Sequence, residues 1–270
     1  MLHNWIPPHR FLPYLTSPEI RDLPGKENIV VLLPVAAIEQ HGPHLPVAVD
    51  SVIACGVIGR ALEKLDAGIP CYSMSPICYG KSNEHIDFSG TICIDAVTLL
   101  DTVLQVCQSL YRAGFRKIAL VNAHGGQPEV MQIAARDARI AHRDLSVFSL
   151  FIWSVPHCGD ELFTEREARC GIHAGAAETA LLLALLPEQV RMDRAVAEYP
   201  PADGPLLTLE GGTSYAWITS DISKSGVIGD PRPATAAMGR TLLESLASSW
   251  VDLIKEIHAF RPPVSSKEKE

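Results

Sequence analysis

The sequence contains no closely spaced pair of cysteines. Its seven cysteines are scattered along 270 residues, and none forms a Cys-x-x-Cys pair. This spacing argues against a cysteine-rich structural metal site. An odd number of scattered thiols predicts reduced, mostly buried cysteines in a cytoplasmic protein.

A membrane-spanning run and a basic surface are also missing. The longest apolar run, Ile29–Ile38, contains a proline, and it falls well short of the ~20 residues that a transmembrane helix needs. No basic region followed by an apolar stretch opens the chain, so we expect no signal peptide. The formal net charge is -8, and no long run of lysine or arginine occurs, since the tail Ser265–Glu270 mixes lysine with glutamate. We therefore expect neither a membrane nor a nucleic acid as a partner.

The chain does contain apolar runs that alternate with longer amphipathic stretches. Hydrophobic residues make up 47% of the sequence, enough for a sizeable core. Strands are predicted over Ile29–Val35, Ile69–Ile77, Lys117–Val121 and Leu145–Trp153, with a short one at Thr91–Ile94. Helices are predicted over Ser17–Asp22, Ser51–Leu65, Ala96–Ala113, Pro128–His142, Ala174–Leu186 and Ala234–Ala259. This alternation predicts a mainly parallel sheet with helices on both faces.

Potential metal ligands follow the first predicted strand closely, within Val31–Asp50. Glu39 and His41 are two residues apart, so in an extended segment their side chains point to the same side. Asp50 comes next, after a Gly-Pro turn. Carboxylates and an imidazole that converge in this way are typical of a divalent-metal site. Asp50 also has a competing role, because it stands just before a predicted helix, where Asp is a favoured N-cap.

His124 stands where the third predicted strand ends, in the segment VNAHGGQ. Parallel sheets bind ligands outside the carboxyl ends of their strands, so this histidine can meet Glu39 and His41. Gly125 and Gly126 allow close backbone approach. They also fit a plain strand–helix turn, or a phosphate-binding loop at a helix N-terminus, although neither GxGxxG nor a Walker lysine is present.

Two further segments carry ionisable groups. The loop Tyr79–Thr91 bears Ser82 and Glu84 beside a histidine, and it fits solvent exposure, substrate contact or subunit packing. His173 and Glu178 open an otherwise apolar helix, where such groups are costly to bury unless they are paired or metal-bound. A hydrogen-bonded core histidine is the plainer alternative there.

The candidate ligands form a nitrogen and oxygen set without thiolate. They are Glu39, His41, Asp50 and His124, with Glu178 and His173 as further candidates. Such a set suits Zn²⁺, Mn²⁺ or Fe²⁺. It is large enough for two ions if one carboxylate bridges them.

Five segments together resemble the creatininase (creatinine amidohydrolase) family. They are LPVAAIEQHGPHLPVAVD, EHIDFSGT, VNAHGGQ, HAGAAETA and SDISKSGVIGDPRPAT, in this order. The resemblance implies a single α/β domain over residues 29–262, built as a three-layer α/β/α sandwich around a mainly parallel sheet. An N-terminal arm (1–28) would precede it and a disordered tail (263–270) would follow it. The resemblance also implies a homo-oligomer, commonly a hexamer.

The resemblance further implies a site with two metal ions. Glu39, Asp50 and His124 would hold one ion, and His41 and Asp50 would hold the second, so that Asp50 bridges the pair.

The chain departs from the creatininase pattern at two positions. Creatininases have a glutamate ligand where Gly126 stands, and a substrate-capping tryptophan where Arg169 stands. Trp153, in contrast, matches an active-site aromatic residue of the family. These departures indicate a family member other than a strict creatininase, with Glu178 as the substitute ligand.

The expected activity is metal-dependent hydrolysis of a C–N amide bond, other than an ordinary peptide bond, in a small cyclic or formamide substrate. A metal-bridging hydroxide would attack the carbonyl, and His173 or Glu178 would pass a proton to the leaving nitrogen. The residues expected to shape the substrate pocket are Tyr79, Ser82, Glu84 and Trp153. The alternatives are a non-hydrolytic small-molecule or nucleotide-binding protein on the same scaffold, and a formamidopyrimidine-nucleotide deformylase-type member of the family.

Overall fold

The fold is built on a four-stranded parallel sheet, seen in a computed structural model that describes residues 3–201, 204 and 206–262. The strands are β1 (Val30–Val35), β2 (Cys71–Ser73), β3 (Lys117–Asn122) and β4 (Ser146–Phe151), in the order β2–β1–β3–β4. Asn122 pairs with Val35 on one side and with Phe151 on the other. The three longer strands therefore end level with one another, and the predicted parallel sheet is confirmed.

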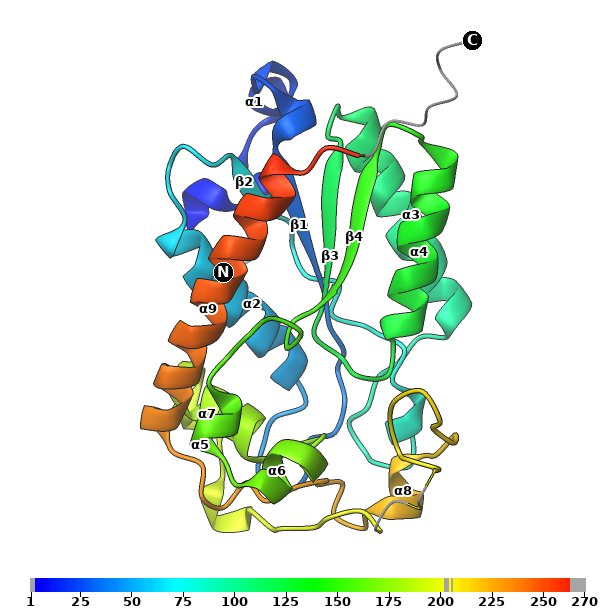
Figure 1. Ribbon diagram of the computed structural model, residues 1–270, viewed down its shortest axis with the longest axis vertical. Helices are drawn as coiled ribbons and strands as arrows, with labels where there is room; N and C mark the ends of the chain where they lie inside the picture. Colours follow the sequence, from blue (N-terminus) through cyan, green and yellow to red (C-terminus); the bar gives the residue numbers. More distant parts are fainter. Residues whose placement is uncertain (1–2, 202–203, 205, 263–270) are drawn as a thin grey trace.

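Helices cover both faces of the sheet (Figure 1). One face carries α3 (Ala96–Arg112) and α4 (Pro128–Ala141), and the other carries α2 (Val49–Lys64) and α9 (Ala236–Ala259). Helix α7 (Ala176–Leu185) packs against α2 and α9. Alternate residues of β1 point to opposite faces. Val31 and Leu33 join the core with α3 and α4, whereas Val30 and Leu32 join the core with α2 and α9. The structure thus has the expected α/β architecture with helices on both sides of the sheet.

The shorter helices lie at the two ends of the sheet (Figure 1). α1 (Ser17–Asp22) belongs to the N-terminal arm, and α5 (Gly159–Leu162), α6 (Glu165–Cys170) and α8 (Thr219–Ile222) lie at the opposite end. α1 has the predicted bounds, because Thr16 and Glu19 form a capping box at its start. The buried Arg10 guanidinium ties the arm to the domain by donating to the carbonyl oxygens of Ile69 and Asp66. The predicted tail, residues 263–270, lies outside the described residues.

Two of the predicted strands are shorter in the structure than the sequence indicated. The strand expected over Ile69–Ile77 is reduced to β2, and Thr91–Ile94 contributes only an isolated bridge between Ile92 and Ile38. Pro34 explains the short β2. In parallel pairing alternate residues of β1 face β2, and Val30 donates to Pro70 on that side. Pro34 is also one of the β1 residues that face β2. Because proline has no backbone N–H, it cannot donate the hydrogen bond that would continue the pairing.

The N-cap role that competed with metal binding at Asp50 is not observed. Helix α2 begins at Val49, and its N-cap is Ala48, which makes no side-chain capping bond. Asp50 lies inside the first turn of the helix, where a carboxylate still interacts favourably with the helix dipole. Its side chain is thereby left to contact residues outside the helix.

All seven cysteines are free thiols, as expected. Three of them, Cys55, Cys71 and Cys107, are buried and the other four are half-buried. Within the described part of the chain, no helix combines the length and apolar character needed to cross a bilayer.

Close packing of α7 against α9 depends on Gly239. A Cβ atom built at this position would lie 1.8 Å from the carbonyl oxygen of Ala180. We expect Gly239→Ala to lower the free energy of unfolding by about 1–3 kcal/mol, because the helices must separate to admit the methyl group. Urea unfolding measures this loss. Arg240→Ala, at the exposed next residue of α9, is the matched control and should unfold within about 0.5 kcal/mol of the wild type. Equal stability of the two variants would contradict the packing argument.

Candidate metal centre

Neighbouring strand ends bring the predicted ligands together. Glu39 and His41 follow β1, and His124 follows β3, which lies beside β1 in the sheet. As a result, the Oε2 atom of Glu39 lies 3.0 Å from Nδ1 of His124. The expectation that these side chains meet at the carboxyl edge of the sheet is confirmed.

Asp50 lies between the two histidines. Its Oδ1 atom is 3.3 Å from Nε2 of His41, and its Oδ2 atom is 3.5 Å from Nδ1 of His124. Each carboxylate oxygen therefore faces a different imidazole. This is the arrangement required of a carboxylate that bridges two cations.

The centre is deeply buried, with Glu39, His41, Asp50 and His124 each no more than 3% exposed. Several of its polar atoms have no hydrogen-bond partner among the described residues: Glu39 Oε2, His41 Nε2 and Asp50 Oδ2. Buried polar groups are normally satisfied. Nitrogen and oxygen atoms left unsatisfied and turned toward one another suit a divalent cation.

The electrostatics of the centre lead to the same conclusion. Burial works to lower the pKa of both His41 and His124, yet neighbouring carboxylates raise each pKa well above its usual value. Burial and the negative charge of Glu39 raise the pKa of Asp50. The cluster therefore attracts positive charge, either as protons on these groups or as a bound cation.

Backbone contacts fix the orientation of His124. Its Nε2 atom lies 3.0 Å from the carbonyl oxygen of Lys81, which can only accept a hydrogen bond, so Nε2 carries the proton. When the ring is neutral, as it must be to bind a cation, the lone pair is then on Nδ1, which faces Glu39 and Asp50. A histidine ligand is commonly held in this way by a hydrogen bond from its other nitrogen. Asn122 fixes the backbone, because its side chain bonds to both the N–H and the carbonyl of His124.

Glu178 reaches the other side of the centre from the first turn of α7. Its Oε2 atom accepts a hydrogen bond from the Ala174 amide at 2.6 Å, and Oε1 lies 3.7 Å from Nε2 of His41. Ala174 itself has a positive φ of 52°. This left-handed conformation costs about 1–2 kcal/mol in an alanine and turns the chain between His173 and Glu178. The structure thus places Glu178 beside His41.

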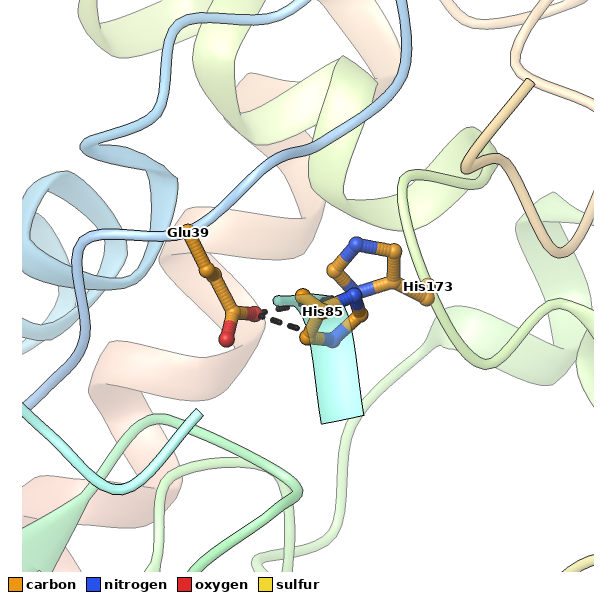
Figure 2. Close-up of side chains that lie close together, drawn as sticks. All are labelled: Glu39, His85 and His173. Atoms are coloured by element: carbon orange, nitrogen blue, oxygen red, sulfur yellow. Dashed lines mark ion pairs between the residues drawn. The ribbon is translucent and has the colours of Figure 1, made fainter. Parts of the chain in front are cut away.

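Sequence reasoning missed two members of the site, Gln40 and His85. Figure 2 shows His85 and His173 close to Glu39, whose Oε1 atom lies 3.7 Å from a nitrogen of each ring. The Gln40 side-chain amide lies 2.9 Å from Nδ1 of His85 and also donates to the carbonyl of Gly226. The one signal for His85 was its position beyond the carboxyl end of β2. Gln40 gave no signal, because its partners are distant in sequence.

A cavity of about 1080 Å³ opens onto the centre. Trp153 and Glu84 line it, and their contact with a substrate stays a prediction. Tyr79 is 55% exposed, Ser82 is fully buried, and neither is among the described residues that line the cavity. Their proposed contact with substrate stays a prediction.

One wall of the cavity is held together by the buried carboxylate of Glu167. This side chain accepts hydrogen bonds from the Ala176 amide at the start of α7, from the Tyr199 hydroxyl and from the Asp230 amide. Its Oε1 atom lies so near three glycines that a Cβ at any of them would come within 3.0 Å: Gly171, Gly175 and Gly229. Three chain segments therefore converge on one carboxylate.

Comparison with known proteins agrees with this geometry. The family model "Creatininase: Creatinine amidohydrolase" matches residues 13–254. The chain belongs to the creatininase family. The resemblance expected from the five sequence segments is thereby confirmed.

Curated relatives within this family have different named activities. A mycofactocin precursor peptide peptidase from Mycobacterium ulcerans is 36% identical over 231 residues, which cover 83% of this chain and 84% of the relative. A creatinine amidohydrolase from Pseudomonas putida is 30% identical over 263 residues, covering 91% and 96%. A 3-dehydro-scyllo-inosose hydrolase from Thermotoga maritima is 28% identical over 262 residues, covering 90% and 82%. Family membership alone therefore does not identify the substrate.

Solved creatininase structures share the fold. A structure described as creatininase with Mn superposes with a TM-score of 0.74 at 27% identity, covering 94% of this chain and 99% of the other. A second creatinine amidohydrolase structure gives a TM-score of 0.72 at 25% identity, with the same coverage. The manganese of the first of these structures agrees with the donor set of the centre.

Metal binding at this centre should stabilise the protein. After chelation, added Mn²⁺ or Zn²⁺ at about 100 times its dissociation constant should raise the free energy of unfolding by about 2.7 kcal/mol per site. The melting temperature in metal titrations measures this effect. Asp50→Asn should lose most of the shift, because each of its oxygens faces a histidine of the centre. Asp137→Asn, on the exposed surface of α4, should keep it. An undiminished shift in Asp50→Asn would rule out this site as the source.

Proposed function

We propose that this chain is a metal-dependent amidohydrolase that uses two divalent ions. The observation that carries the proposal is the position of Asp50, with one carboxylate oxygen toward His41 and the other toward His124. Glu39, Asp50 and His124 would hold one ion. His41, Asp50 and Glu178 would hold the second.

The roles of the ligands follow from which atoms are left for an ion. Glu178 gives its Oε2 atom to the Ala174 amide, so Oε1 remains beside His41. We therefore assign Glu178 to metal binding rather than to proton transfer. When bound, Zn²⁺, Mn²⁺ or Fe²⁺ would provide a water acidified to near neutral pH and would polarise a substrate carbonyl.

His173 is the proposed proton carrier. Its Nε2 atom lies 2.7 Å from the Gln40 backbone carbonyl oxygen and 3.0 Å from the Gln40 side-chain nitrogen. Donation to the closer carbonyl would leave the lone pair of the neutral ring on Nδ1. Burial lowers the pKa of His173 well below the usual value, and the nearby His41 and His85 lower it further. A neutral imidazole can accept a proton from the attacking water and pass it to the leaving nitrogen. Gln40 would be a positioning residue, because it holds the ring of His173.

The leading substrate class is a small amide, either cyclic or a formamide. Trp153 and the carboxylates of the cavity would orient it. A peptide amide is the second candidate, for two reasons. The cavity of about 1080 Å³ exceeds what a single small ring fills, and the M. ulcerans relative is named as a peptidase.

The assembly is also part of the proposal. We infer a homo-oligomer, with the hexamer that the family resemblance implies. Light scattering coupled to size exclusion would test it, and a monomer at micromolar concentration would exclude it.

Proton transfer can be separated from metal binding. We expect His173→Asn to lower kcat by about 10²–10⁴-fold, the usual contribution of a general acid–base, while keeping the wild-type metal content. Steady-state kinetics and elemental analysis of the same preparation measure both quantities. His142→Asn, which replaces a histidine at the end of α4, is the control and should match the wild type. Unchanged kcat in His173→Asn would remove this residue from the reaction.

The substrate class can be tested with one panel of compounds. Cyclic ureides, lactams, formamides and short peptides should be incubated with the metal-loaded protein, and amide cleavage followed by mass spectrometry. Turnover of a ring or formamide supports the leading class, and turnover of peptides alone supports the second. Metal-loaded protein that binds such compounds without cleaving any of them would favour a non-hydrolytic binding protein.

A further inference from the structure

The two ring nitrogens of His85 lie in different surroundings. The ring is 3% exposed and lines the cavity. Its Nδ1 atom lies 2.9 Å from the side-chain nitrogen of Gln40 and 2.8 Å from the hydroxyl oxygen of Thr219. Its Nε2 atom faces Glu39 (Figure 2), whose Oε1 atom is 3.7 Å away. That separation is too long for a hydrogen bond, so only the Nδ1 side of the ring is held by partners.

Two backbone groups fix which way the Gln40 side-chain amide points. The Gly42 amide donates to its Oε1 atom at 2.8 Å, and its Nε2 atom donates to the Gly226 carbonyl oxygen at 3.0 Å. Exchanging the oxygen and the nitrogen would set two donors against each other at Gly42 and two acceptors at Gly226. The atom of Gln40 that faces His85 is therefore the nitrogen.

This orientation places the ring proton of His85 on Nε2. An amide nitrogen only donates, and one of its two protons goes to Gly226. The other could reach His85 Nδ1 or His173 Nε2. The His173 nitrogen lies 2.7 Å from a carbonyl oxygen, so it carries a proton of its own. The second Gln40 proton is left for Nδ1 of His85, which accepts it with its lone pair, and the ring is neutral with its proton on Nε2.

The two stacked histidines therefore present opposite groups to Glu39. Their ring centroids are 4.2 Å apart, and His173 offers the lone pair of Nδ1 where His85 offers the N–H of Nε2. A nitrogen that carries a proton does not coordinate a cation, so His85 is not a metal ligand, although it lies among possible ligands. Among the described residues its N–H makes no hydrogen bond. It is a buried donor that faces the cavity and still needs an acceptor.

We propose that His85 donates its Nε2–H to the amide oxygen of the substrate, and that Gln40 and Thr219 hold the ring in the tautomer that this requires. The inference rests on the proposed amidohydrolase function. When water attacks the amide carbon, the electron pair of the C=O bond moves to the oxygen, and a fixed N–H stabilises that charge. A neutral imidazole is suited to polarise a carbonyl in this way. His85 keeps its proton throughout, while His173 beside it takes the proton of the water.

The first test is the position of the ring proton. In protein labelled with ¹⁵N-histidine and loaded with Zn²⁺, long-range ¹H–¹⁵N correlation spectra distinguish the two tautomers of a neutral imidazole. The signals of His85 are those that disappear in His85→Gln. We expect the Nε2–H tautomer for His85. A proton on Nδ1, or a Zn²⁺ ion bound to Nε2, would overturn the proposal.

The second test moves the donor within the side chain. The amide nitrogen of glutamine can take the place of Nε2, whereas that of asparagine lies nearer the place of Nδ1. On an amide that the wild type cleaves, His85→Asn should lower kcat about 10²–10³-fold, and His85→Gln should stay within about 10-fold of the wild type. KM should change less than kcat in His85→Asn, and the metal content of both variants should match the wild type. Equal losses of kcat in the two variants would indicate a structural role and overturn the proposal.

The outcomes separate this inference from the proposed function. An Nδ1–H tautomer, or wild-type kcat in His85→Asn, would overturn the role of His85 in a protein that still binds metal and cleaves an amide. Wild-type protein that cleaves no compound of the panel would instead overturn the proposed function, and the role of His85 with it.

Discussion

Buried negative charge governs the structure around the centre. Glu39 and Asp50 lie side by side beneath the ends of β1 and β3, with Glu178 reaching in from α7. Carboxylates removed from water repel one another unless positive charge neutralises them. The raised pKa values of His41 and His124 show that protons meet this need when no cation does. Cation binding at such a centre releases protons, so affinity for the ion must fall as the pH is lowered.

The parts of the site that follow from strand ends could be predicted from the sequence. Glu39, His41 and His124 each stand just beyond an apolar run, and in a parallel sheet all such ends share one edge. A local signal worked equally well for α1, because Ser17 and Pro18 indicate a helix start and the helix spans Ser17–Asp22. These inferences needed only contacts between close neighbours in the chain or the geometry of a parallel sheet.

Contacts between distant segments could not be predicted where the geometry of the sheet does not itself bring the segments together. The sequence predicts both a helix cap and a metal ligand for Asp50, and its distances to two histidines from different loops favour the ligand. Gln40 contacts His85 and His173, which are 45 and 133 residues away. The place of Glu84 depends on a missing side chain at Gly126, where a Cβ atom would overlap its carboxylate, and an absence has no pattern of its own. The length of β2 was overestimated, because its limit is imposed by Pro34 on the neighbouring strand.

Glu167 limits how the residues that line the cavity can be changed. Its carboxylate joins the start of α7 to the segments around Tyr199 and Asp230, with three glycines closely packed around it. A change in any one of these segments must preserve the shape of the other two. The wall can therefore be changed only as a block, whereas Trp153 lies on a separate segment, the loop after β4. Grafting a new specificity onto this scaffold would succeed by exchanging that block whole, rather than one loop at a time.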